Sequence, residues 1–80
     1  MTSTDASIRI GRRISALRDA RHMTQADLAE ALGVSRSTVT MWETGAHYPP
    51  IALLGPLARV LDCRIEDILA NPPADEETSA

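Results

Sequence analysis

With 80 residues, the chain has room for one small domain with a lean core, and none for a separate catalytic or sensor domain. Hydrophobic residues make up 44% of the chain and aromatic residues only 2%, so the core must be built from aliphatic side chains. A single cysteine excludes an internal disulfide, and no apolar run approaches the roughly 18 residues of a membrane span or resembles a signal peptide. We therefore expect a cytoplasmic protein with no membrane partner.

Charge is unevenly distributed along the chain, whose net charge is −3. The terminal segment NPPADEETSA contains three acidic residues and no basic one, so it supplies the whole excess of negative charge. It has nothing apolar enough to bury, and we expect residues 71–80 to form a disordered acidic tail. Residues 1–36 hold six of the eight arginines against four acidic residues. This basic end is compatible with binding to nucleic acid.

The first helix is predicted from an apolar stripe that follows a polar leader. The leader MTSTDAS shows no periodicity, and we expect residues 1–7 to be a flexible N-terminus. Ile10, Ile14 and Leu17 then lie at positions i, i+4 and i+7. This spacing places the three side chains on one face and predicts an amphipathic helix over residues 8–21.

Two short helices follow, each with a start signal and a stop signal. Thr24 is a favourable N-cap, and Asp27 three residues later completes a pattern similar to a capping box. Gly33 ends this second helix, because glycine accepts the left-handed conformation of a helix end. Ser35 caps a third helix, which Gly45 closes in the same way. The gap between the two helices is therefore about three residues.

The remaining apolar stripes predict two closing helices, the first of which contains a proline. Proline in a helix interior costs about 3 kcal/mol unless it lies in the first turn. We therefore expect the regular helix to begin near Gly55, with Pro56 in its first turn and residues 49–54 as a looser turn. The buried stripes of the two helices are predicted to be Leu57, Ala58 and Leu61, then Ile65, Ile68 and Leu69. Cys63 falls between them and is expected to be a buried, inert thiol.

The third helix has two opposed faces. At about 100° per residue, Ser37, Thr40 and Thr44 share one side, whereas Val39 and Trp42 lie on the other. The first side carries small hydroxyl groups, with an arginine at the helix start and no acidic residue. Arginine binds guanine through two hydrogen bonds, and serine or threonine binds base edges or phosphates. The alternative from periodicity alone is a solvated helix that happens to lack charge.

The sequence resembles the helix-turn-helix of lambda repressor-like (Cro/C1, Xre-type) DNA-binding domains. "MTQADLAEALGVS" is similar to the family pattern L-[TS]-Q-x-x-L-A-x-x-x-G-[VI]-S, and "STVTMWETG" to x-x-[IV]-x-x-[WF]-E-x-G. Similarity continues in "RRISALRDARHMTQ" and "PPIALLGPLARVLDCRIEDIL", so it covers residues 8–70 without an insertion. The resemblance implies an all-α, compact five-helix domain with the helix-turn-helix at its second and third helices. The third helix would then enter the major groove of DNA.

Roles for individual residues follow from the resemblance. The positions that match contacts to bases are Arg36, Ser37, Thr40 and Met41. The positions that match contacts to the DNA backbone are Thr24, Gln25, Ser35, Thr44, His47 and Tyr48. Gln25 would also brace the third helix, although a polar residue at a helix start needs no ligand, and the side chains of His47 and Tyr48 are equally compatible with solvation or packing. Arg18 and Glu43 match an ion pair that orients the third helix, and Trp42 matches a core position.

Two departures from the family pattern affect helix ends. His22 and Asp62 stand where the family commonly has glycine. Each must therefore adopt the left-handed conformation at some cost, or the helix before it must end differently. Serine or threonine often caps the last two helices of the family, whereas this chain has Pro50 and Arg64.

Catalysis is not expected from this sequence. The two histidines are 25 residues apart on different turns, and the one cysteine lies on a third element, so they form no metal or nucleophile constellation. No glycine-rich phosphate loop is present. We therefore expect no enzyme activity, no cofactor and no metal.

The resemblance, together with the outer face of the third helix, predicts a sequence-specific DNA-binding transcriptional regulator, with a repressor favoured over an activator. It would insert its third helix in the major groove of a palindromic operator and bind double-stranded DNA as a homodimer through its last helix. The alternative is a protein-binding adaptor or antitoxin-type module with the same fold and a protein partner. The operator sequence, the choice between repression and activation, and the biological pathway stay open.

Overall fold

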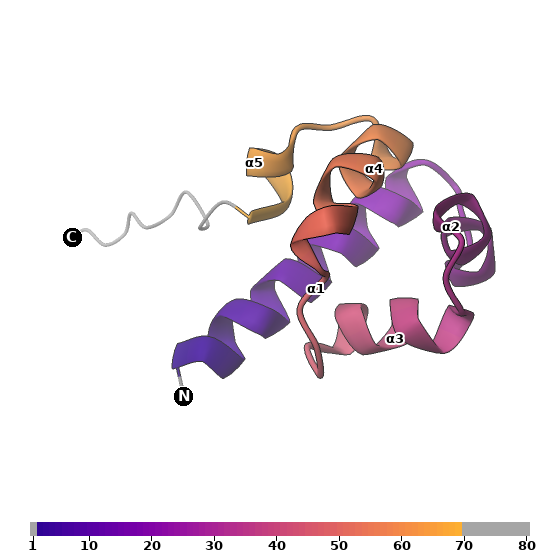
Figure 1. The fold of residues 1–80 in the computed structure, drawn as a ribbon. Helices are drawn as coiled ribbons and strands as arrows, with labels where there is room; N and C mark the ends of the chain where they lie inside the picture. The colour runs from indigo at the N-terminus through magenta and orange to yellow at the C-terminus, as the bar shows by residue number, and fades with distance from the viewer. Residues whose placement is uncertain (1, 70–80) are drawn as a thin grey trace.

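Five α-helices make up the part of the chain that the computed structural model describes, which is residues 2–69. No strand occurs within those residues, so the expected all-α class is confirmed. The predicted acidic tail, residues 71–80, lies outside them. The helices are α1 (Thr2–Ala20), α2 (Gln25–Leu32), α3 (Arg36–Thr44), α4 (Ile51–Leu61) and α5 (Ile65–Leu69) (Figure 1).

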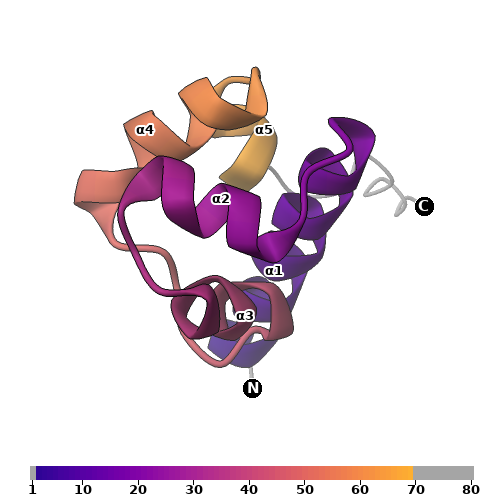
Figure 2. The same cartoon turned by 90° about the vertical axis from the view of Figure 1, so that its right-hand side faces the viewer.

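All five helices contribute to one aliphatic core that contains a single aromatic side chain. The long α1 runs diagonally through the molecule, with α3 below it and α4 and α5 above (Figure 1), and α3 lies below α2 in the second view (Figure 2). Trp42 is only 2% exposed, as the sequence predicted for a core position. The buried hydrophobic residues are Ile14, Leu28, Ala29, Val39, Trp42, Leu57, Ala58, Leu61 and Ile68.

The start of α2 is a complete capping box. The Asp27 backbone N–H donates to the Thr24 hydroxyl at 3.0 Å, and the Thr24 backbone N–H donates to the Asp27 carboxylate at 2.9 Å. These two hydrogen bonds satisfy donors that a helix start leaves unpaired. The bond from the Thr24 backbone also holds the pKa of Asp27 below its usual value.

Left-handed residues end four of the helices. Gly33 and Gly45 take φ values of 73° and 87° after α2 and α3, as the stop signals predicted. His22 and Asp62 each take a φ of 58°, so these non-glycine residues accept the strained conformation instead of ending their helices differently. Ser35 caps α3 by accepting a hydrogen bond from the Thr38 backbone N–H at 3.2 Å.

The first helix begins earlier than the sequence predicted. Residues 2–7, expected to be a flexible end, belong to α1 instead. Ser7 is 6% exposed, and its hydroxyl donates a 2.7 Å hydrogen bond to the carbonyl oxygen of Gly45. This contact joins residues 38 positions apart in the chain, so the local periodicity of the sequence could not predict it. The end of α3 therefore packs against the early turns of α1.

The fourth helix also begins earlier, at Ile51, so the prediction of a start near Gly55 was wrong. Pro56 lies inside the helix and removes the N–H that would bond the carbonyl of Ala52. A side chain before proline normally clashes with the proline ring in the helical conformation, but Gly55 has no Cβ to clash. Leu53 packs against the core from the first turn, which favours the longer helix.

The last helix covers the core with one residue only. Ile68 is 1% exposed, whereas Ile65 and Leu69 are 39% and 43% exposed. The prediction that all three would form a buried stripe was therefore wrong for the outer two. A helix of five residues presents only a single turn to its neighbours, so most of its side chains stay at the surface.

Cys63 is half-buried beside the core between α4 and α5. Burial raises the pKa of its thiol, and the negative charges of Asp67 and Asp62 raise it further. The raised pKa favours the protonated thiol, as expected of an inert cysteine, but Cys63 is half-buried, so the prediction of a buried thiol was wrong.

Helices α1 and α3 approach each other closely at Gly11. A Cβ atom at this position would overlap the carbonyl oxygen of Trp42 and would lie 2.6 Å from the carbonyl oxygen of Glu43. Both are backbone atoms of α3, so no side-chain rotation can relieve the overlap. The absence of a side chain at Gly11 is what lets the two helices pack at this distance.

We expect Gly11→Ala to lower the free energy of unfolding by about 2 to 3 kcal/mol, because the added methyl group forces α1 away from α3. Chemical denaturation followed by circular dichroism measures this loss. Gly33→Ala is the matched control: nothing lies within 4 Å of its Cβ position, so only the left-handed backbone opposes it, at about 1 kcal/mol. A smaller loss for Gly11→Ala than for Gly33→Ala would contradict the close-approach explanation.

Candidate nucleic-acid interface

Helix α3 presents one face to solvent and buries the other. Val39 and Trp42 are 0% and 2% exposed, in agreement with the inner face predicted from the sequence. On the opposite face, Thr40 is half-buried and Met41 is 36% exposed. The other exposed residues of this outer face are Arg36, Ser37 and Thr44. The four candidate base contacts therefore lie together on α3.

The outer face of α3 presents no negative charge. The helix has no acidic residue in its first turn, and its one carboxylate, on Glu43, is only 6% exposed. Arg36 is exposed, and its guanidinium group makes no hydrogen bond or ion pair with any residue between 2 and 69. A positive group without an internal partner thus stands at the start of a neutral helix face.

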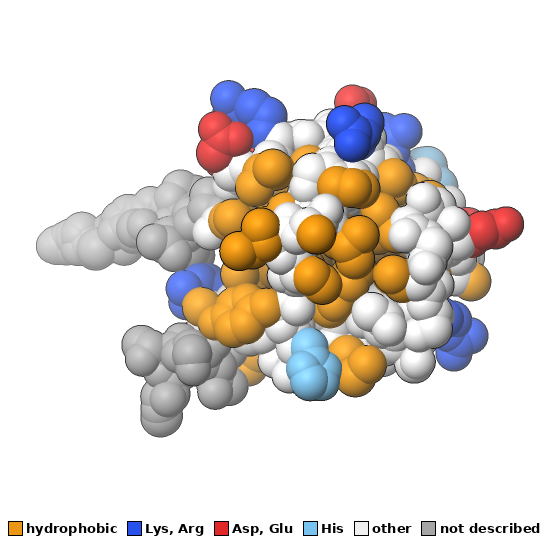
Figure 3. Space-filling model, viewed as in Figure 1, with side chains coloured by type: hydrophobic (Ala, Val, Ile, Leu, Met, Phe, Trp, Pro, Cys, Tyr) orange, Lys and Arg blue, Asp and Glu red, His pale blue; other side chains and the backbone are white. Residues whose placement is uncertain are grey.

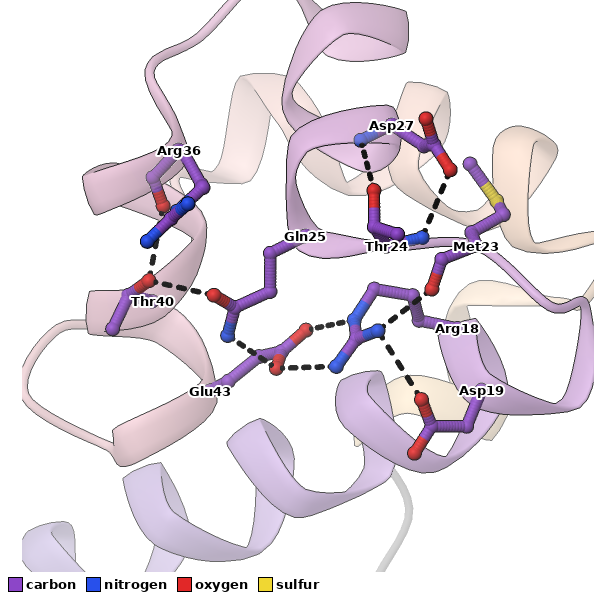
Figure 4. Close-up of polar contacts among 9 residues, drawn as sticks. All are labelled: Arg18, Asp19, Met23, Thr24, Gln25, Asp27, Arg36, Thr40 and Glu43. Atoms are coloured by element: carbon purple, nitrogen blue, oxygen red, sulfur yellow. Dashed lines mark hydrogen bonds and ion pairs between the residues drawn. The ribbon is translucent and has the colours of Figure 1, made fainter.

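Arg18 of α1 and Glu43 of α3 form a buried ion pair with two hydrogen bonds. Arg18 Nε lies 2.6 Å from Glu43 Oε2, and Arg18 Nη2 lies 3.0 Å from Glu43 Oε1 (Figure 4). The two side chains are 12% and 6% exposed. The hydrogen bond to Glu43 raises the pKa of Arg18 above its usual value and outweighs the opposing effect of burial. Arg18 also donates to the carbonyl oxygen of Met23 at 2.7 Å.

Gln25 and Thr40 extend this pair into a chain of hydrogen bonds through three helices. Gln25 Nε2 donates to Glu43 Oε1 at 3.0 Å, and the Thr40 hydroxyl donates to Gln25 Oε1 at 3.0 Å (Figure 4). The family resemblance gave Gln25 a bracing role. It did not reveal the contact with Thr40, because the pairing of these two side chains depends on the crossing of α2 and α3.

The hydroxyl groups proposed to contact the DNA backbone are mostly engaged within the protein. Thr24 and Ser35 serve as helix caps, and Ser35 Oγ also lies 3.1 Å and 2.9 Å from the hydroxyls of Ser37 and Thr38. The Thr44 hydroxyl turns back to the carbonyl oxygen of Met41 at 3.3 Å. His47 and Tyr48 are exposed in the loop that follows α3.

The starts of α2 and α3 enclose an open hollow of about 400 Å³. Two candidate backbone contacts, Thr24 and Gln25, line it together with the candidate base contact Arg36. The structure therefore brings these residues from separate helices to one surface. Among residues 2–69, no group of histidine, cysteine and carboxylate side chains is arranged to hold a metal ion, and no helix is long and apolar enough to cross a membrane.

Comparison with known proteins identifies the family. The family described as "Helix-turn-helix" matches residues 14–68, which include all of α2 and α3. The chain belongs to the Cro/C1-type helix-turn-helix family of DNA-binding transcriptional regulators. An uncharacterised helix-turn-helix transcriptional regulator from Archaeoglobus fulgidus is 41% identical over 56 residues, which cover 70% of this chain and 79% of the relative.

Solved structures of the family share this fold. The restriction-modification controller protein C.AhdI from Aeromonas hydrophila matches with a TM-score of 0.72 and 30% identity, over 76% of this chain and 92% of the controller. Hydroxypropylphosphonic acid epoxidase from S. wedmorenis matches with a TM-score of 0.74 and 33% identity, over 86% of this chain but only 36% of the enzyme. The match to the epoxidase is confined to its helix-turn-helix portion, and the helix-turn-helix protein described here is not an enzyme.

We expect Glu43→Ala to lower the free energy of unfolding by about 3 to 5 kcal/mol, because it removes the buried partner of the Arg18 guanidinium and leaves only the exposed carboxylate of Asp19, 3.2 Å away, to balance its charge. Thermal and chemical denaturation measure the loss. Arg21→Ala is the control, since it breaks the exposed pair of Arg21 and Asp62, whose side chains are 44% and 83% exposed, and should cost under about 1 kcal/mol. Equal losses of unfolding free energy for the two variants would show that breaking the buried ion pair costs no more than breaking the exposed one.

Proposed function

We propose that this protein is a repressor that binds a palindromic operator as a homodimer, with α3 of each subunit in the major groove. The observation that carries the proposal is the outer face of α3, where an arginine without an internal partner and small hydroxyl side chains stand clear of any carboxylate. DNA repels acidic groups, and short side chains let a helix approach the groove closely. The similarity to a restriction-modification controller supports a regulator of this kind, acting in the cytoplasm where the DNA lies.

Base and backbone contacts divide between the two helices of the motif in this proposal. Arg36, with its free guanidinium group, binds a guanine, and Ser37, Thr40 and Met41 face neighbouring base edges. Gln25 binds a phosphate from the start of α2, because its amide carries two N–H donors and Glu43 uses one of them. The other backbone contacts of the proposal are Thr24, Ser35, Thr44, His47 and Tyr48.

The exposed side of α5 supports a homodimer. Ile65 and Leu69 lie four positions apart on this helix and remain 39% and 43% exposed. Ile51 at the start of α4 is 86% exposed, and hydrophobic side chains gather over the middle of the face shown in Figure 3. Burying such side chains against a second copy is favourable, and a two-fold dimer would present two α3 helices to a palindromic site.

Substitution of Arg36 tests the mode of DNA binding. We expect Arg36→Ala to weaken binding to an operator selected from a random pool by about 1 to 3 kcal/mol and to relax the preference at one base pair of each half-site. Binding titrations on operator and random duplexes measure both effects. Arg59→Ala is the matched control, since it removes another exposed arginine, which lies on α4. An equal loss on operator and random DNA would show that Arg36 contacts only phosphate.

Salt dependence separates a DNA-binding protein from a protein-binding adaptor. Neutralised phosphates release counterions, so the logarithm of the binding constant should fall with the logarithm of salt concentration, by about 0.9 per phosphate contacted. An adaptor would enrich no sequence from the random pool. If selection at about 50 mM salt, where phosphate contacts are strong, enriched nothing, the regulator proposal would be wrong.

Substitution on α5 tests the dimer. We expect Ile65→Glu to raise the dimer dissociation constant by about tenfold or more, because it places a charge in the proposed apolar interface. The monomer should stay folded, since Ile65 is partly exposed and glutamate is favourable at a helix start. Sedimentation equilibrium measures the change, with Glu66→Gln on the same helix as control. An unchanged mass distribution for Ile65→Glu would place the interface elsewhere.

A further inference from the structure

A series of side-chain hydrogen bonds runs from Arg18 through Glu43 and Gln25 to Thr40. Each hydrogen bond in this series can have only one donor and one acceptor. Arg18 has only donors and an ionised carboxylate has only acceptors, so Glu43 must accept the two bonds from Arg18. Glu43 Oε1 is also 3.0 Å from the side-chain amide of Gln25. A carboxylate cannot donate, and at 6% exposure water cannot readily replace the contact, so the NH₂ group of Gln25 must point to Glu43.

This orientation of Gln25 turns its carbonyl oxygen towards Thr40. Gln25 Oε1 lies 3.0 Å from Thr40 Oγ1, and an amide oxygen is only an acceptor, so the hydroxyl proton of Thr40 must be donated to it. The second internal neighbour of this hydroxyl, the carbonyl oxygen of Arg36 at 3.1 Å, is also only an acceptor. Two internal acceptors therefore compete for the single proton of Thr40, and none is left to donate outward.

We propose that Thr40 reads DNA only as a hydrogen-bond acceptor and selects the exocyclic amino group of adenine or cytosine in the major groove. The adenine N6 and cytosine N4 amino groups are the donors that the major groove offers, whereas guanine N7 and O6 and thymine O4 are acceptors. Phosphate oxygens are also acceptors, so Thr40 is excluded from the DNA backbone. This inference rests on the proposed insertion of α3 in the major groove and adds the chemistry of one of its contacts.

Valine in place of threonine isolates the hydroxyl group, because it keeps the shape and the methyl group that can contact a thymine. The operator is first selected with the wild-type protein from a random pool, and the base pair whose preference is lost in Thr40→Val is identified. Duplexes are then made in which that pair lacks either its amino group, by use of purine for adenine or 2-pyrimidinone for cytosine, or the purine N7, by use of a 7-deaza base. Each duplex is titrated with both proteins.

Loss of the amino group should weaken wild-type binding about 2- to 12-fold, the range of a neutral hydrogen bond, and should have no such effect on Thr40→Val. The 7-deaza base should change the binding of both proteins by the same factor. Thr40→Ser should restore the dependence on the amino group, because it restores the hydroxyl. Thr38→Val makes the same chemical change on α3 away from the outer face. It removes a contact with the Ser35 hydroxyl, so overall affinity can change, but the dependence on the amino group should stay as in the wild type.

Distinct outcomes overturn the inference and the proposed function. If the wild-type protein selects no operator, the proposed function fails before Thr40 is tested. If an operator is selected but Thr40→Val weakens operator and random DNA equally, or alters the preference at no pair, the acceptor role is wrong. A dependence of the wild-type protein, but not of Thr40→Val, on the purine N7 would show that Thr40 donates to the base.

Discussion

The buried pair of Arg18 and Glu43 is the interaction on which the arrangement of the proposed DNA-binding surface depends. It joins the end of α1 to the last turn of α3 by two hydrogen bonds, and Gln25 brings α2 to the same carboxylate. Removing two charges from water offsets much of their attraction, so such a pair adds little stability over well-packed apolar residues. Its two-point geometry instead fixes the rotation of α3, and hence the direction in which its outer face points.

The position of α3 is constrained further by other residues on the face of α1 that carries Arg18. Ser7 donates a hydrogen bond to the carbonyl oxygen of Gly45, Gly11 leaves room for the backbone of α3, and Arg18 forms an ion pair with Glu43. These three positions fall on one face of α1, so the C-terminal half of α3 is fixed at several points. The start of α3 is capped by Ser35, and its N-terminal half packs on the core through Val39, which is 0% exposed. The arginine proposed to enter the groove therefore stands at the end of α3 opposite to these contacts with α1.

The parts of this structure that depend on local chemistry could be predicted from the sequence. Thr24 with Asp27, Ser35, and the two glycine stops specify the limits of α2 and α3 through contacts within a few residues. The predictions failed where distant packing decides the outcome. The early turns of α1 follow from a contact with Gly45, and the helical course through Pro56 follows from packing of the first turn of α4 on the core. The contact with Gly45 leaves no periodic signal, whereas Leu53 is in helical register with Leu57 and Leu61, and the prediction failed there because the cost of Pro56 was given more weight than this pattern.

For the candidate site, the resemblance named four residues that the structure places together on α3, but it did not give their hydrogen-bonding state. Threonine can donate or accept, and its sequence position alone does not choose between them. The choice at Thr40 follows from Glu43, because a buried carboxylate with no proton to give imposes one direction on Gln25 and, through it, on the hydroxyl. In the proposed contact, a residue that never reaches the DNA decides which base edge is read. Glu43, an acidic side chain that would be unfavourable next to phosphates if it were exposed, would then determine specificity from the buried side of α3.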